Sequence, residues 1–84
     1  MNMQVKLPKL ESGKCAVVFA EKTTGVLLTT NGRYYLGEGE FYRVFDSERE
    51  ADAFALAYVQ SNPSVECSIR DSEGRHLRFV NHEE

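Results

Sequence analysis

The sequence contains few of the residues that usually mark a chemical site. Only two cysteines and two histidines occur among its 84 residues, and no CxxC motif is present. A zinc site needs such residues at characteristic spacings, and His76 and His82 do not have the spacing of paired ligands. The sequence therefore predicts no metal site and no cofactor.

Long hydrophobic runs are also missing. None has the length that a bilayer-crossing helix needs, and residues 1–14 lack the continuous apolar core of a signal peptide. The formal net charge of −3 provides no excess of basic residues for a polyanionic partner. We therefore expect a cytoplasmic protein that does not contact membranes.

The residues that are present suffice for one small hydrophobic core. Five phenylalanines, four tyrosines and a hydrophobic content of 42% are typical of a folded chain. We expect a flexible N-terminal arm at residues 1–13, a single folded domain at residues 14–80 and a polar tail at residues 81–84. Pro8 argues against a central strand within the arm.

The clearest helical pattern lies within residues 45–63. Ser47 followed by Glu50 forms a capping box, with Asp46 as the alternative N-cap. Asn62 tolerates a left-handed conformation, and the proline after it disfavours helix, so the helix should end there. The apolar positions at helical spacing form one stripe: Ala51, Phe54, Ala55, Tyr58 and Val59.

The segment before the helix has the pattern of strands and turns. Residues 14–21 form a nearly continuous apolar run, which is typical of a central strand buried on both faces. Residues 26–30 form a second strand that ends at Asn31-Gly32, the strongest hairpin motif in the chain. A two-residue loop there predicts that Leu28 lies opposite Tyr35.

Three more strands complete the predicted fold. Residues 41–45 lead into the helix, and residues 65–70 and 75–80 form a closing hairpin. The predicted fold is therefore α+β, an antiparallel sheet of about five strands packed against a single α-helix. The expected order is three or four strands, one helix and then two strands. Because the single helix covers one face of the sheet, the opposite face is expected to receive no cover from this chain.

The register of the closing hairpin follows from pairing Asp71 with Arg75. Apolar residues then share one side of the hairpin: Cys67, Ile69, Leu77 and Phe79. Polar residues share the other: Ser68, Arg70, His76 and Arg78.

Catalysis is not predicted from this arrangement. Cys67 or Cys15 as nucleophile with His76 as base would be the simplest constellation, but the register places Cys67 and His76 on opposite sides. In a reducing compartment Cys15 and Cys67 are expected to be two buried thiols. A disulfide between them is the alternative if their strands are neighbours. The segment Gly37-Glu38-Gly39 lacks the following helix of a phosphate-binding loop, and its acidic neighbours would repel an anion.

The uncovered sheet face is the predicted interaction surface. We expect it to contain these aromatic and basic residues: Tyr34, Tyr35, Tyr42, Arg43, Arg70, His76 and Arg78. Tyrosine and arginine are enriched at interfaces, so the predicted function is a non-catalytic interaction or regulatory module whose partner is a second copy, as a homodimer, or another protein.

Two alternatives stay open for the same face. Rings that stack on bases beside arginines that hold phosphates are typical of domains that bind single-stranded nucleic acid. The more ordinary interpretation is a solvated face whose arginines pair with glutamates such as Glu38, Glu40 or Glu66. The negative net charge makes the nucleic-acid interpretation the less favoured function.

Overall fold

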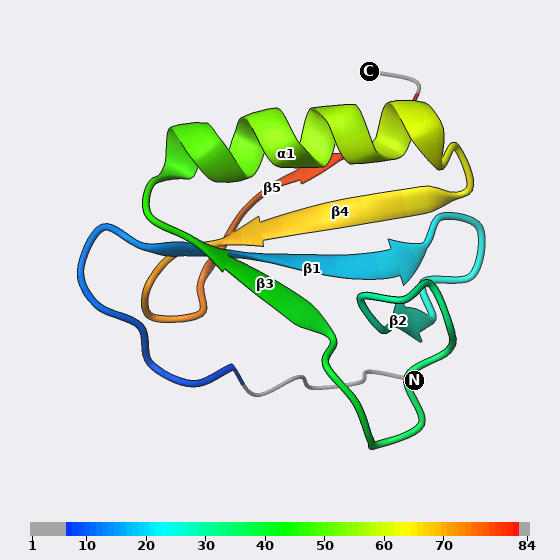
Figure 1. Ribbon diagram of the computed structural model, residues 1–84, viewed down its shortest axis with the longest axis horizontal. Coiled ribbons are helices and arrows are strands. Elements are labelled where there is room, and N and C mark those ends of the chain that lie inside the picture. Colours follow the sequence, from blue (N-terminus) through cyan, green and yellow to red (C-terminus); the bar gives the residue numbers. More distant parts are fainter. Residues whose placement is uncertain (1–6, 83–84) are drawn as a thin grey trace.

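The computed structural model describes residues 7–82 and confirms the predicted α+β class, with one helix and a five-stranded antiparallel sheet among the described residues (Figure 1). The elements in chain order are β1 (Cys15–Glu21), β2 (Leu27–Leu28), β3 (Tyr42–Phe45), α1 (Glu48–Ser61), β4 (Val65–Arg70) and β5 (His76–Val80). Parts of the predicted arm and tail, residues 1–6 and 83–84, lie outside the described residues. Within residues 7–82, no helix has the length and apolar character needed to cross a membrane.

Strand β1 is the centre of the sheet, as its apolar run predicts. Both β2 and β3 pair with β1, and β4 pairs with β1 and with the outer strand β5, always antiparallel. Residues 15–19 are all buried, which requires neighbours on both faces of this strand. A continuous apolar run, rather than an alternating one, is the sequence pattern that such a position demands.

Helix α1 covers one face of the sheet, and its predicted ends are confirmed. Ser47 is the N-cap, and its Oγ accepts a hydrogen bond of 3.1 Å from the backbone N–H of Glu50. At the other end, the Nδ2 of Asn62 donates to the carbonyl oxygen of Tyr58 at 2.9 Å. The helix buries its stripe of small residues against the sheet: Ala51, Ala55 and Val59.

Aromatic rings fill the space between α1 and the sheet beside these small residues. The ring of Phe19 on β1 lies 4.9 Å from that of Tyr58 and 6.2 Å from that of Phe54, between centroids. Phe54 also packs against Phe45 of β3 at 4.9 Å. The helix is therefore held to the sheet by small residues along its axis and by rings at its flank.

The two cysteines lie in this core as free thiols. Their strands are neighbours, but Cys67 pairs with Phe19, four residues further along β1 than Cys15. Four residues of a strand span about 13 Å, well beyond the reach of a disulfide. The predicted free, buried state is confirmed.

The predicted register of the first hairpin is wrong by one residue. Leu28 bridges Tyr34 rather than Tyr35, and the backbone N–H of Thr29 donates to the carbonyl of Arg33 at 2.7 Å. The loop is therefore longer than two residues and contains Gly32 at a φ of 85°. The Thr29 hydroxyl accepts from the N–H of Arg33 at 3.2 Å, which favours this wider turn.

The predicted register of the closing hairpin is also wrong. Arg70 pairs with His76 as predicted, but Ile69 pairs with Arg78, which leaves Leu77 without a partner in a β-bulge. Beyond the bulge each side chain of β5 lies on the face opposite to the predicted one. Arg78 consequently turns toward α1, while Phe79 turns away from it and is 55% exposed.

The sheet face opposite α1, called the far face below, follows from these pairings. Its residues alternate with those of the core and are cross-strand partners of one another: Ala16, Val18, Tyr42, Val44, Ser68, Arg70, His76 and Phe79. The far face is not open across its width, because Ala16 is 0% and Val18 is 5% exposed. This corrects the expectation that the chain leaves that face uncovered.

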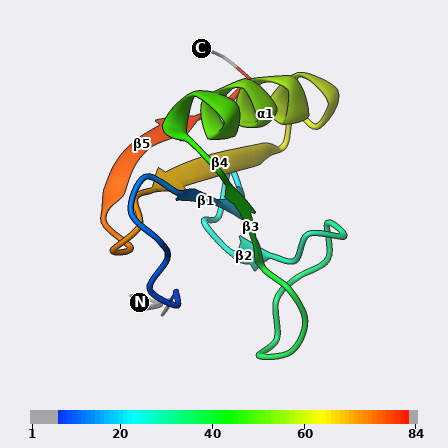
Figure 2. The ribbon, with the colours of Figure 1, turned by 60° about the vertical axis from the view of Figure 1, so that its left-hand side comes forward.

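The arm before β1 contributes to this arrangement. Figure 2 shows the segment that precedes β1 on the side of the sheet away from α1. The backbone N–H of Leu10 donates to the carbonyl of Ser72 at 2.9 Å, which ties the arm to the β4–β5 turn. The exposed parts of the far face are therefore its two margins, at β3 and at β5.

Candidate functional site

The seven predicted surface residues do not share one face. Tyr42, Arg70 and His76 lie on the far face. Tyr35 contacts Phe41, with 4.8 Å between ring centroids, and Phe41 in turn contacts Tyr42. These contacts place Tyr35 beside the far-face group.

The other three predicted residues lie toward α1. The Cζ of Arg43 lies over the Phe54 ring, 5.5 Å from its centroid. Tyr34 bridges the core residue Leu28, and its hydroxyl donates to a carboxylate oxygen of Glu21 at 3.3 Å. Together with Arg78, these residues are separated from the far face by the sheet itself.

Arg78 has an alternative role that its position explains. Its Nη1 lies 2.6 Å from Oε2 of Glu48, and its Nη2 lies 3.0 Å from Oδ1 of Asp52. The hydrogen bonds that the Arg78 guanidinium donates to Glu48 and then to Asp52 raise the pKa of Arg78. Arg78 therefore joins the edge strand β5 to the first turns of α1 and is not available to a partner on the far face.

The β5 margin, defined as His76, Leu77 and Phe79, combines two residues of the far face with the bulged Leu77 between them. All three residues are exposed, and the rings of His76 and Phe79 lie 4.3 Å apart. The Oγ of Ser68 lies 3.0 Å from Nδ1 of His76, which holds the imidazole against the sheet. Phe79 thus presents its ring from a supported position.

The pair of Ser68 and His76 was not anticipated from the sequence. A serine beside a histidine is one component of a nucleophile–base pair, in which a carboxylate normally orients the base. Here the cross-strand partner of His76 is the cation Arg70, and Ser68 is buried. The contact therefore holds the His76 side chain in place.

The cysteines offer no better nucleophile. Cys67 lies in the core beneath α1, on the side of the sheet opposite His76, as the sequence predicts. Burial raises the pKa of the Cys67 thiol to about 12, and burial also raises that of Cys15. Both thiols are therefore protonated at neutral pH and inert as nucleophiles.

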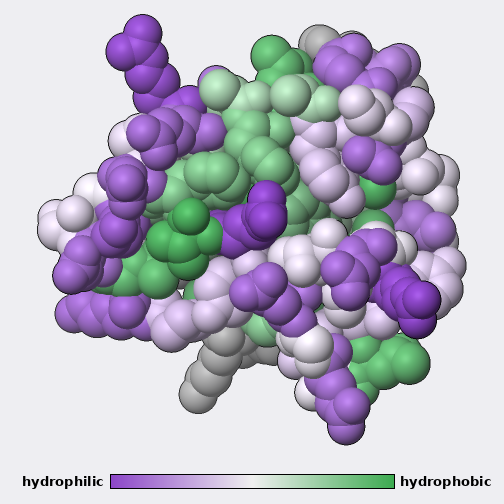
Figure 3. Space-filling model, viewed as in Figure 1, coloured by the Kyte–Doolittle hydropathy of each residue, from purple (hydrophilic) through white to green (hydrophobic). Residues whose placement is uncertain are grey.

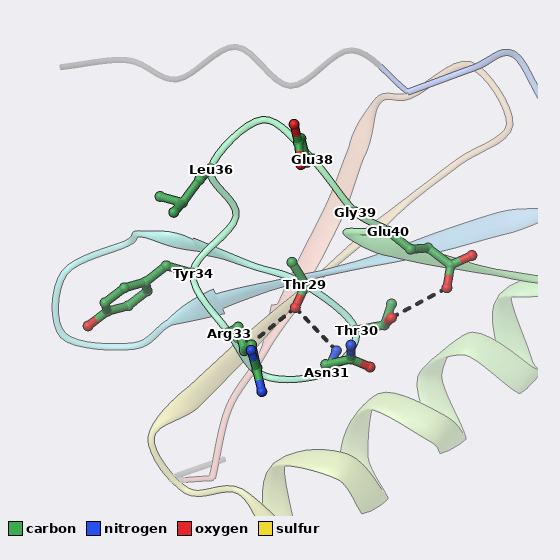
Figure 4. Close-up of a pocket in the computed structure, with 9 residues that line it drawn as sticks. All are labelled: Thr29, Thr30, Asn31, Arg33, Tyr34, Leu36, Glu38, Gly39 and Glu40. Atoms are coloured by element: carbon green, nitrogen blue, oxygen red, sulfur yellow. Dashed lines mark hydrogen bonds between the residues drawn. The ribbon is translucent and has the colours of Figure 1, made fainter.

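A hollow lies on the loop between β2 and β3 (Figure 4). Figure 4 shows Thr29 in the middle of its lining residues, with its hydroxyl accepting hydrogen bonds from the N–H groups of Asn31 and Arg33. The Thr30 hydroxyl donates to a carboxylate oxygen of Glu40 at 3.3 Å. These hydrogen bonds fix the conformation of the loop. The hollow is therefore a consequence of how the chain turns here.

The glycines of this loop do not form an anion site. Gly37 and Gly39 have φ values of 94° and 98°, which glycine adopts without strain. The strand β3 follows them, whereas a phosphate loop needs a helix N-terminus at that place. Glu38 and Glu40 line the hollow as well, and their carboxylates would repel an anion.

Metal ligation finds no support among residues 7–82. No group of three or more His, Cys, Asp or Glu side chains in that range could hold a metal ion. In comparisons with family models, curated proteins and solved structures, nothing matches the chain.

The residue that sequence reasoning missed is Phe79. Its position in an alternating strand predicts burial, and only the bulge at Leu77 reverses it. The carboxylates of Glu48 and Asp52, four residues apart on one face of a helix, are the feature that could have suggested a cationic partner for this face.

Proposed function

We propose that this protein is a non-catalytic interaction module that self-associates as a homodimer through the β5 margin. One observation carries the proposal: Phe79 is a large aromatic side chain, 55% exposed, on an outer strand of the sheet. Aromatic residues are the usual anchors of protein interfaces. The exposure of Leu77 beside it extends the apolar surface along the same strand.

The supported position of His76 adds to this proposal. A side chain that is already immobilised loses little conformational entropy when a partner binds. His76 is held by Ser68 and by the Phe79 ring before any partner arrives. The β5 margin therefore combines apolar area with a low ordering cost.

The chain also has enough accessible surface to bury the area that a stable dimer requires. A stable dimer buries about 800 Å² on each partner, which is roughly a seventh of the 5685 Å² accessible surface of this chain. A small domain has only a modest core, so that burial in a dimer adds considerably to its stability. A twofold axis at the β5 margin would place the same residues of both copies in contact.

Binding of single-stranded nucleic acid is the second candidate, favoured by the aromatic and basic residues of the far face. Arg70 and His76 lie there beside Tyr42 and Phe79. However, the guanidinium of Arg70 already donates to the carbonyl of Gly74 at 3.1 Å, and the net charge is −3. Few cationic groups remain for phosphates, so self-association is the better supported function.

A reducing compartment such as the cytoplasm is part of the proposal. The two unpaired, buried thiols support it, because oxidising compartments favour disulfides in small domains.

Molar mass by size-exclusion chromatography with light scattering, at two protein concentrations, tests the proposal. We expect twice the chain mass of 9.5 kDa for the wild type and 9.5 kDa for Phe79→Ser. Leu56→Ser is the matched control, because Leu56 is 47% exposed but lies on α1. A wild-type monomer at both concentrations, or an unchanged Phe79→Ser dimer, would exclude this interface.

A further inference from the structure

Within residues 7–82, the outer edge of β3 has no strand paired to it. In that part of the chain β3 pairs with β1, through four consecutive pairs from Cys15–Phe45 to Val18–Tyr42. Among the described residues, no hydrogen bond joins residues 42–45 to any neighbour on the other side. Figure 1 shows β3 at the front of the molecule, below the start of α1, with no strand beside its outer edge. The unpaired N–H and C=O groups of this edge are a template for another strand.

The remaining sheet edges are less suited to strand addition. Strand β5 contains the bulge at Leu77, and bulges prevent regular edge pairing. Strand β2 is only two residues long. The ladder between β3 and β1, in contrast, runs without a register shift.

Side chains on both faces of β3 could contact an added strand. Val44 is 42% exposed on the far face, and Phe45 packs on Phe54 on the helix side. A groove runs along this segment, lined by Glu40, Tyr42, Arg43, Val44 and Phe45. Figure 3 shows hydrophobic surface in the region where α1 approaches β3, with hydrophilic groups around it.

The positive charge at this edge comes from Arg43, while the Glu40 carboxylate in the same groove accepts a hydrogen bond from the Thr30 hydroxyl at 3.3 Å. No carboxylate of residues 7–82 forms an ion pair with Arg43, whereas Arg75 and Arg78 each have one or more. Arg43 is an exposed residue, and its guanidinium lies over the Phe54 ring. A guanidinium stacked on a ring keeps its N–H donors free at its rim, where a carboxylate can bind.

We propose that the β3 edge binds an extended, acidic segment of another protein as an added strand, with a carboxylate of that segment on Arg43. Main-chain hydrogen bonds to β3 supply the affinity. Alternate side chains of the segment point to opposite faces, so an acidic side chain lies beside Arg43 while its apolar neighbours lie beside Val44. This site is separate from the β5 margin, because β1 and β4 lie between β3 and β5 in the sheet.

The test is a titration followed by ¹H–¹⁵N amide spectra. The probe is the blocked peptide acetyl-Val-Glu-Val-Glu-Val-amide, and acetyl-Val-Lys-Val-Lys-Val-amide is its charge control. We expect shift changes centred on residues 42–45, with the acidic peptide binding about two- to fivefold more tightly, as one exposed ion pair allows. Replacing the central valine of the acidic peptide by proline should weaken binding, because proline lacks the N–H that a ladder needs.

Two variants assign the preference to one side chain. Arg43→Gln should remove the preference for the acidic peptide, and Arg75→Gln, at an exposed position on the β4–β5 turn, should retain it. Dispersed amide spectra for both variants show that the fold is retained. The readout at residues 42–45 does not depend on the dimer, because Phe79→Ser can be titrated in the same way.

Three results would overturn the proposal. These are the absence of shift changes at residues 42–45, equal affinity for the acidic and basic peptides, and changes confined to the β5 margin. If the amide shifts of residues 42–45 change when the protein concentration is raised without peptide, this edge would instead be assigned to a second copy of the chain.

Discussion

The bulge at Leu77 makes a quantitative prediction, because it exchanges the environments of two adjacent residues. Val80 is 6% exposed and belongs to the core, whereas Phe79 is 55% exposed. Val80→Ala removes two buried methyl groups, which corresponds to about 1.6 kcal/mol of transfer free energy and roughly 2–3 kcal/mol with the cavity that remains. Phe79→Ala removes a ring that is less than half buried and should cost about 1 kcal/mol.

Urea denaturation followed by far-UV circular dichroism measures both changes in the free energy of unfolding. The measurement belongs at protein concentrations where the wild-type midpoint no longer changes, so that dimer dissociation does not contribute. Equal slopes with urea would show that the variants unfold from the same native state. The unbulged register predicts the opposite order, with about 3–5 kcal/mol for a buried Phe79. A larger loss for Phe79→Ala than for Val80→Ala would therefore refute the bulge.

Three further predictions follow from local contacts. Ser47→Ala should lower the free energy of unfolding by about 1 kcal/mol through loss of the N-cap, again measured with urea, and no change would contradict the capping role. Arg78→Gln should cost less than about 1 kcal/mol, because its ion pairs are partly exposed, and the cost should shrink in high salt; an equal cost at both ionic strengths would exclude an electrostatic origin. Between pH 9.0 and about 12 the unfolded chain ionises the Cys67 thiol while the native chain keeps it protonated, so stability should fall with pH by at most about 1.4 kcal/mol per unit. The stability of Cys67→Ala should fall less steeply over that pH range. A slope identical to that of the wild type would contradict the assignment of this pH dependence to the Cys67 thiol.

The helix and the central strand could be predicted because their determinants are local. Ser47 and Glu50 are three residues apart, and the stop at Asn62 precedes a proline directly. Apolar and polar residues do not alternate in the run of residues 14–21. Both faces of this strand are therefore expected to be buried, whatever its register. Neither feature depends on knowing which strands are neighbours.

The registers of the two hairpins could not be predicted in the same way. The first depends on the Thr29 hydroxyl, which captures the amide of Arg33 and widens the turn. The second depends on Arg78, whose carboxylate partners Asp52 and Glu48 are 26 and 30 residues away in the chain. Pairing apolar residues with one another across the hairpin ignores both contacts.

The sequence by itself determined the class of fold, the ends of the helix and the position of β1, because capping residues and apolar runs act within a few residues. Only the tertiary structure decided which residues lie on which face. The physical reason is the two-residue period of a strand, by which one bulge moves every following side chain to the other face. In this protein the bulge at Leu77 turns Arg78 toward the carboxylates of α1 and leaves Phe79 exposed on the margin of the sheet.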